Sequence, residues 1–389
     1  MTDNNVSAPD LAQLLTHHSE KWRNFDRDVL PLPVAEMDFP IAEPIKKVLL
    51  DMVSKSDLGY LGSVPELPAG FAKFAAQRWG WDVDTSQVRV AADVGVAVVE
   101  VLRVFTNPGD IILINSPVYQ NFYNWMNETH LQMIDVPFTR TGDQSDDKNP
   151  WELDWDAVEK AYASGLKVHL MCSPHNPLGR VYSKAELTRV AEMAKKYGVL
   201  VISDEIHAPL TYKENTFTPF LSLSETAREV GITVTAASKG WNIAGLKCAI
   251  IVSHNESIDE NLKKLPKAVH FRASILGAFA SAAAFADSGI WLDSVINQLD
   301  QNRFMIKDLL AAQLPTVGYH IPHNSYLAWL DLESLNLGEN PSAALLEKGR
   351  VAFNPGHTYG AQCGQYVRLN FATSPVIISE AIDRIVRTL

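Results

Sequence analysis

The sequence has 389 residues, of which 47% are hydrophobic and 20% charged, a balance that is typical of folded globular proteins and excludes disorder over most of the chain. The formal net charge is −11, and no run of Lys or Arg resembles the cationic surface that binds nucleic acids or anionic membranes. We therefore expect neither nucleic acid nor membrane as a partner.

The cysteines and the first residues indicate a reducing environment. Cys172, Cys248 and Cys363 form an odd, widely spaced set, which suits neither a disulfide framework nor a structural zinc site. The start of the chain, MTDNNVSAPD, is polar and shows no secretory signal pattern. The most apolar segment, residues 273–292, is rich in Ala and interrupted by Asp287, so it is predicted to be a buried or interface helix. We expect a cytoplasmic protein.

In chain order, the first 45 residues contain prolines at positions 31, 33, 40 and 44 and are predicted to form an irregular arm. Short β-branched runs then alternate with amphipathic, helix-length segments. Strands are predicted at residues 87–93, 110–116, 131–138, 167–173, 199–205, 232–238 and 248–253, and helices at 96–106, from Tyr119 onward, and at 183–198. This alternation, with strands apolar on both faces, indicates an α/β fold whose mostly parallel sheet is covered by helices on both sides.

The pattern changes after about Ala273. Long helices are followed by a strand, a helix and a strand at residues 325–332, 342–350 and 365–372, which predicts a smaller α+β domain. We divide the chain into an arm that contributes to the small domain, a large domain and a C-terminal small domain, at residues 1–45, 46–285 and 286–389. The polar segment 139–150 is predicted to be a surface loop.

Ligands of such sheets bind at the carboxyl ends of the strands, where four segments of this chain place reactive residues. In DVGV, the amides of Val94 and Gly95 begin a helix and could hold a phosphate, although Asp93 could equally be a plain helix cap. SPHNPLGR supplies Asn176, within ordinary turn chemistry. SDEIHAP supplies Asp204, a carboxylate that needs a partner if it is buried, whereas its neighbour Glu205 is expected to be an ordinary acid.

The fourth segment, SKGWN, places Lys239 after a strand. A lysine is usually solvated, but its amine becomes a nucleophile when burial or a nearby cation lowers its pKa. Lys247 could provide that cation or bind a phosphate. Tyr119 presents an aromatic face at another strand end, and Arg368 is a cation within an apolar strand, suited to a structural ion pair or to a bound carboxylate.

Together these residues fit one cofactor, pyridoxal phosphate (PLP). Lys239 could form an imine, Asp204 could pair with a pyridinium nitrogen and Asn176 could bind a phenolate oxygen. The chain contains neither GxGxxG nor GxxxxGK[ST], the motifs of dinucleotide-binding and P-loop proteins. The histidines also lack HExxH spacing, so we expect no metal site.

The motifs also carry a family resemblance. PHNPLGR, DEIHAP and SKGWN occur with KWRNFDRDVLPLPVAEMDFP, LGYLG, NSYLAWLDL and VRLNFATS in an order and spacing that cover nearly the whole chain. The sequence resembles fold-type I PLP enzymes, and most closely the MalY/PatB group of cystathionine β-lyases, which is related to the class I and II aminotransferases. The resemblance implies a homodimer with shared active sites and an amino-acid substrate.

The resemblance also implies roles for single residues. Lys239 would be the Schiff-base lysine and proton carrier, Asp204 the partner of the pyridine nitrogen, Tyr119 the stacking ring and Arg368 the ligand of the substrate carboxylate. The other implied cofactor contacts are Asn176 at the ring oxygen, His207 near the cofactor with no assigned step, and Val94, Gly95, Ser238, Lys247 and the Tyr60 of the neighbouring subunit at the phosphate.

Three positions depart from the family pattern. Asp93 stands where many relatives have Gly, Pro33 replaces the usual Trp of LPLW, and Glu36 replaces the usual Asp. The last two lie near the expected substrate entrance. The resemblance implies α,β-elimination from L-cystathionine or a related cysteine S-conjugate, giving pyruvate, ammonia and a thiol. An aminotransferase is the alternative, and a regulatory protein that keeps the fold is a third reading.

Overall fold

The computed structural model describes residues 6–141 and 149–389. The middle of the predicted polar loop, residues 142–148, lies outside the described residues. On either side of it, the short strands β5 (Phe138–Arg140) and β6 (Trp151–Leu153) pair antiparallel.

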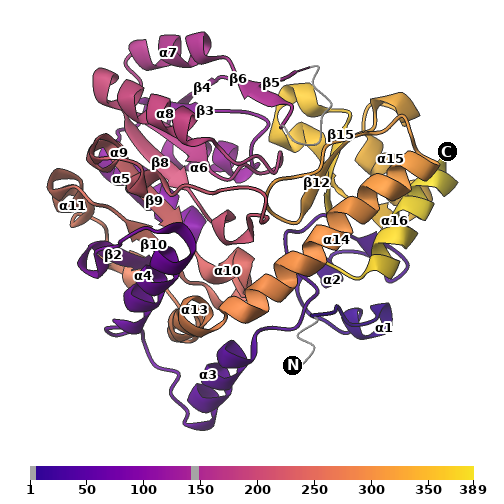
Figure 1. Cartoon of the computed structure of the whole chain (residues 1–389), viewed down its shortest axis with the longest axis horizontal. Coiled ribbons are helices and arrows are strands. Elements are labelled where there is room, and N and C mark those ends of the chain that lie inside the picture. Colours follow the sequence, from indigo (N-terminus) through magenta and orange to yellow (C-terminus); the bar gives the residue numbers. More distant parts are fainter. Residues whose placement is uncertain (1–5, 142–148) are drawn as a thin grey trace.

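A central sheet organises the larger part of the molecule (Figure 1). Within the described residues it has seven strands in the order β2-β10-β9-β8-β7-β3-β4. All neighbours are parallel except at β10, which runs antiparallel to both β2 and β9. The predicted, mostly parallel α/β sheet is therefore confirmed. The strands are β2 (Val88–Ala91), β3 (Ile111–Ile114), β4 (Gln132–Asp135), β7 (Val168–Cys172), β8 (Leu200–Asp204), β9 (Gly231–Thr235) and β10 (Ala249–Val252).

Helices cover both faces of this sheet. Successive strand residues enter two different hydrophobic cores, as Ile112 and Leu113 do on β3, because side chains alternate along a strand. Helix α8 lies within the predicted range 183–198, because Ser183 and Glu186 form a capping box at its start and Gly198 ends it in a left-handed conformation. The helices are α3 (Glu43–Ser54), α4 (Glu66–Trp79), α5 (Val94–Phe105), α6 (Asn121–Thr129), α7 (Trp155–Ala163), α8 (Lys184–Tyr197), α9 (Glu225–Val230), α10 (Ala237–Gly240), α11 (Glu256–Leu262), α12 (Lys267–Phe271) and α13 (Ile275–Asp287).

The alanine-rich segment forms α13, most of which is buried and which packs against α3 and α4, as predicted for a core helix. Among the described residues no single helix is long and apolar enough to cross a membrane. Only α13 and the following helix, α14 (Gly289–Gln313), have together the length and apolar composition of a membrane span, and they meet at a bend of 80°.

The long helix α14 (Gly289–Gln313) leads to a second, antiparallel sheet, shown in orange and yellow in Figure 1. Its four strands within the described chain lie in the order β11-β12-β15-β14. This part has the strand-helix-strand pattern predicted after residue 325. Its elements are β11 (Gly318–Tyr319), β12 (Leu327–Asp331), α15 (Pro341–Gly349), β14 (Asn354–Pro355), β15 (Tyr366–Asn370) and α16 (Pro375–Thr388).

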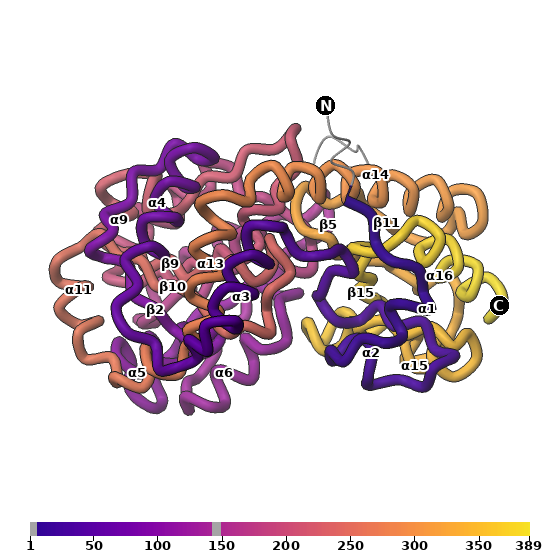
Figure 2. The backbone as a smooth tube through the Cα atoms, turned by 90° about the horizontal axis from the view of Figure 1, so that it is seen from below, coloured from indigo at the N-terminus to yellow at the C-terminus, as the bar shows by residue number. Residues whose placement is uncertain are grey.

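The first part of the N-terminal arm lies beside this second sheet, as the indigo segment beside the yellow elements in Figure 2 shows. It contains α1 (Leu11–Leu14) and α2 (Glu20–Arg23), and its strand β1 (Leu30–Pro31) pairs in parallel with β13 (Val351–Ala352). Helix α3 begins at Glu43, slightly ahead of the expected end of the arm.

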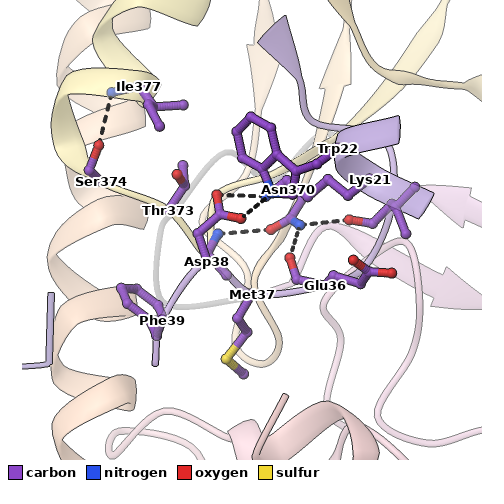
Figure 3. Close-up of polar contacts among 12 residues, drawn as sticks. Lys21, Trp22, Glu36, Met37, Asp38, Phe39, Asn370, Thr373, Ser374 and Ile377 are labelled. Carbon is purple, nitrogen blue, oxygen red and sulfur yellow. Dashed lines mark hydrogen bonds and ion pairs between the residues drawn. The ribbon is translucent and has the colours of Figure 1, made fainter. Parts of the chain in front are cut away.

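A buried ion pair fixes the arm (Figure 3). Lys21 Nζ lies 2.8 Å from Asp38 Oδ2, and the Lys21 side chain is fully buried. The Trp22 indole donates to Asp38 Oδ1 at 3.0 Å, and the Asp38 amide donates to the Ala372 carbonyl at 2.8 Å. Asn370 Nδ2 donates to two more arm carbonyls. The ion pair thus holds two parts of the arm together, and hydrogen bonds from the Asp38 amide and the Asn370 side chain join the arm to the second sheet.

We predict that Asp38→Ala lowers the free energy of unfolding by about 3–5 kcal/mol, because it leaves the Lys21 ammonium buried without a counter-charge. The matched control is Lys55→Ala, which removes an exposed ion pair to Asp51 at 2.7 Å and should cost less than about 1 kcal/mol. Urea unfolding of the two variants measures the difference. Equal, small losses would contradict a stabilising role for the buried pair.

Candidate active site

A cavity of about 600 Å³ lies at the carboxyl ends of the large sheet's strands and is closed by the arm and by β15. Its volume is typical of pockets for small ligands. Ten of the eleven residues singled out in the sequence line it: Val94, Gly95, Tyr119, Asn176, Asp204, His207, Ser238, Lys239, Lys247 and Arg368. The topology therefore brings together residues that are up to 274 positions apart, from Val94 to Arg368.

One end of the cavity is the first turn of α5. Asp93 caps this helix by accepting a hydrogen bond from the Val96 amide at 2.8 Å. Its other carboxylate oxygen lies 3.1 Å from Lys247 Nζ. The plain helix cap and the possible anion site are therefore both present, because the amides of Val94 and Gly95 remain at the helix N-terminus, where an anion is stabilised.

Asp204 is the last residue of β8 and is 4% exposed. Its Oδ1 accepts a hydrogen bond from the Ile206 amide at 3.2 Å. Burial raises the pKa of the Asp204 carboxyl to about 7, and this amide and the Lys239 ammonium only partly oppose the shift. A cationic ligand atom beside Asp204 would restore the charge balance that burial disturbs.

Lys239 lies in the short helix α10, directly after β9. Its Nζ donates a hydrogen bond to the Ala35 carbonyl of the arm at 2.8 Å. Burial and, to a smaller extent, the Arg368 guanidinium lower the pKa of the amine to about 8, against the opposing charges of Glu36 and Asp204. Lys239 is thus a buried amine rather than an ordinary solvated cation. Because its pKa is lowered, the amine is a better nucleophile and base near neutral pH.

Arg368 projects from β15 and is 2% exposed. The structure gives it no structural ion pair with an acid of the described chain. Its guanidinium instead donates to Asn176 Oδ1 at 3.1 Å and to the Pro33 carbonyl at 2.8 Å. The buried Nε has no hydrogen-bond partner among the described residues. A buried guanidinium bound only to neutral oxygens can still bind a carboxylate.

Tyr119 and His207 also line the cavity. Burial raises the pKa of the Tyr119 hydroxyl, which accepts a hydrogen bond from Asn121 Nδ2 at 2.8 Å. Burial, Lys239 and Arg368 hold the pKa of the His207 imidazole well below its usual value. His207 Nδ1 lies 3.2 Å from the Ser325 hydroxyl. The imidazole is therefore neutral at physiological pH.

Pro33 and Glu36 of the arm were expected near the substrate entrance and do line the cavity, but the main-chain contacts of the arm were missed from the sequence. Glu20, Asn24 and Phe25, and residues 33–36, line the cavity, and two of their main-chain carbonyls bind Lys239 and Arg368. A carbonyl leaves no mark on the residue type, so only the family-like run KWRNFDRDVLPLPVAEMDFP pointed to this segment. Glu205 also differs from a surface acid: it is 1% exposed, and burial raises its pKa to about 8.

Tyr60 is the one predicted site residue that lies outside the cavity. Its side chain is 91% exposed, beside the exposed Leu58 and Phe271. Within a single chain it contacts none of the other residues described above.

Comparison with known proteins agrees with this geometry. Residues 27–385 match the family described as aminotransferase class I and II. The chain is 36% identical to a cystathionine beta-lyase of Corynebacterium glutamicum, over 98% of this chain and 99% of the relative. It is 30% identical to the cystathionine beta-lyase PatB of Bacillus subtilis, over 92% of each.

A solved structure shares the whole fold. Cystalysin from Treponema denticola, whose crystal structure contains a pyridoxal 5'-phosphate cofactor, superimposes with a TM-score of 0.91 at 28% identity, over 100% of this chain and 99% of that protein. The chain therefore belongs to the class I and II aminotransferase family, in the branch of the MalY and PatB cystathionine β-lyases.

Proposed function

We propose that this protein is a PLP-dependent carbon–sulfur β-lyase. It would convert L-cystathionine, or a related cysteine S-conjugate, to pyruvate, ammonia and a thiol. One observation carries the proposal: the amine of Lys239, the carboxyl of Asp204 and the guanidinium of Arg368 meet in a single cavity, each without a permanent ionic partner in the described chain. The named lyases among its relatives support the same reaction.

The residues fit PLP. The buried Asp204 needs a cation, which a protonated pyridine nitrogen supplies. The free amides at the start of α5, with Ser238 and Lys247, offer a phosphate site on the same wall of the cavity. Tyr119 provides a ring face for stacking, and Asn176 provides an amide in the same cavity. When bound, PLP supplies an electron sink that allows the Cα–H bond of an amino acid to lose its proton and the β substituent to leave.

The chain's own groups then have separate tasks. Arg368, with its unsatisfied Nε, binds the substrate carboxylate and thereby fixes the orientation of the Cα–H bond. Lys239, with a pKa of about 8, is neutral often enough near neutral pH to accept that proton at Nζ. Asp204 keeps a negative charge beside the ring nitrogen. The neutral His207 lies beside them and competes for no proton.

The reaction is tested by its products. L-cystathionine incubated with the loaded enzyme should give pyruvate and free thiol without any added keto acid. If the reaction instead depends on an added keto acid, the protein is an aminotransferase, the activity for which the wider family is named. Failure to bind PLP at all would contradict the proposal.

Lys239→Ala should lower the rate of pyruvate formation by about 10²–10⁴-fold, the usual contribution of a positioned general base, and should remove the visible absorption of the loaded enzyme. Lys213→Ala is a matched control, because Lys213 is exposed and donates only to Asn297, at 2.8 Å. Absorbance spectra and a thiol assay measure both effects. A coloured, fully active Lys239→Ala variant would overturn the assignment.

Asp204 should also make the stability of the apoenzyme depend on pH. Its pKa rises from 3.8 to about 7 on folding, so the folded state binds more protons than the unfolded state between these values. The free energy of unfolding that Asp204 contributes therefore falls as the pH rises through this window. Asp204→Asn removes the effect. In urea unfolding of the apoenzyme, the free energy of unfolding of the variant should therefore rise relative to that of the wild type from pH 5 to pH 7.5. Parallel pH curves would contradict a raised pKa.

We further propose that residues 1–45, 46–285 and 286–389 act as arm, large domain and small domain, and that the protein is a homodimer. The exposed Tyr60, with Leu58 and Phe271, supports a subunit contact at this surface, because large apolar side chains rarely cluster in solvent without one. Tyr60 would reach the cofactor phosphate of the neighbouring subunit.

If so, Tyr60→Phe should raise the Kd for PLP by about tenfold, the effect of losing one hydrogen bond to a charged group, without changing the dimer mass. Titration of the apoenzyme and light scattering measure the two quantities. A monomer at micromolar concentration would contradict the dimer, and an unchanged Kd would contradict the phosphate contact.

A further inference from the structure

The cavity contains a polar group that none of the assignments above uses, the indole N–H of Trp125. Trp125 lies on α6, is 7% exposed and lines the cavity. Two aromatic rings fix its orientation: Tyr119 meets it edge to face with centroids 6.2 Å apart, and Phe122 lies at 5.1 Å. The indole is therefore held against the cavity wall rather than free to turn.

The N–H edge of this indole faces the first turn of α5. A Cβ atom placed on Gly95 would lie 3.2 Å from Trp125 Nε1 and 3.3 Å from its Cζ2. Both distances are shorter than an ordinary van der Waals contact, so a side chain at residue 95 would push the indole edge away by a few tenths of an ångström, and glycine lets it lie close. Gly95 thus brings the indole N–H and the amides of the helix N-terminus to one place.

This N–H has no acceptor among the described residues. The indoles of Trp22 and Trp241, in contrast, donate to Asp38 and to the Ser288 carbonyl, at 3.0 and 3.2 Å. The Trp125 Nε1 atom is not among the buried atoms without a partner, so it is accessible from the cavity that the residue lines. A fixed donor that is open to the cavity beside a helix N-terminus is suited to an anionic ligand.

The charges at this end of the cavity also favour an additional, uncharged hydrogen-bond donor for a bound phosphate. Asp93 places a carboxylate at the same helix end, and Lys247 pairs with it at 3.1 Å. The positive charge of Lys247 is therefore shared between Asp93 and any bound phosphate. A hydrogen bond from Trp125 adds attraction for the phosphate without adding another ion to be neutralised.

We propose that Trp125 is a ligand of the cofactor phosphate, donating a hydrogen bond from Nε1, and that glycine at position 95 allows the indole to lie close to the start of α5. The inference rests on the proposed use of PLP and adds a residue to its phosphate site. It makes Trp125 a direct contact of the cofactor rather than a packing residue of α6.

The test compares the affinity of the apoenzyme for PLP and for pyridoxal, which lacks the phosphate. Trp125→Phe keeps an aromatic ring against Phe122 and Tyr119 but removes the donor. We expect it to raise the Kd for PLP by about tenfold or more, as for a lost hydrogen bond to a charged group, and to leave the Kd for pyridoxal unchanged. Equilibrium titration measures both constants without any activity assay.

Trp329→Phe is the matched control. The Nε1 atom of Trp329 has no hydrogen-bond partner among the described residues either, but it is buried, and this residue stacks on Tyr366 at 5.1 Å and does not line the cavity. Its substitution should change neither constant. An equal loss of affinity for PLP and pyridoxal in Trp125→Phe would show a packing role and overturn the inference, as would no change in either.

A crystal structure of the PLP-loaded wild type tests the contact independently of any variant. Nε1 of Trp125 should lie within about 3.2 Å of a phosphate oxygen. A longer separation, or another acceptor on Nε1, would overturn the inference and leave the lyase proposal intact. A wild-type apoenzyme that binds no PLP would instead overturn the proposed function itself.

Discussion

The buried ion pair between Lys21 and Asp38 is the constraint on which the active site depends. Burying two charges is costly unless each finds its partner, so the pair forms only when α2 and the following arm segment adopt one arrangement. That arrangement places the carbonyls of Pro33 and Ala35 in the cavity, where they bind Arg368 and Lys239. The position of both cations is therefore set partly by a contact outside the cavity.

The arm also links the two sheets. Asn370 of the small domain binds the carbonyls of Val34 and Glu36, at 2.7 and 2.6 Å. Asn242, three residues after Lys239, binds the amide and the carbonyl of Met37, both at 2.9 Å. Asn242 adopts a left-handed conformation, with φ of 58°, which asparagine tolerates better than most residues. One stretch of arm is thus held from the large and the small domain at once, and this explains the Asn of SKGWN without any cofactor contact.

The features that the sequence predicted well are those that depend on the types of side chain. Apolar runs identified the strands, Ser183 and Gly198 marked the ends of α8, and the positions of Asp204 and Lys239 after strands pointed to one edge of the sheet. The reversed direction of β10 was not predictable, because an antiparallel strand buried on both faces has the same apolar pattern as a parallel one. Main-chain contacts leave no signature in the sequence, so the arm carbonyls could not be found.

Carbonyls in segment 33–36 alternate in direction: those of Pro33 and Ala35 accept hydrogen bonds from Arg368 and Lys239, whereas those of Val34 and Glu36 accept hydrogen bonds from Asn370. Such alternation fixes the number of residues in this segment. Inserting or deleting a single residue between Pro33 and Asp38 would exchange the two sets of carbonyls. Replacements of side chains are compatible with this geometry, but changes of length are not. The side chains of this part of the cavity wall can therefore change by substitution, whereas its length is fixed by the main-chain contacts at both of its faces.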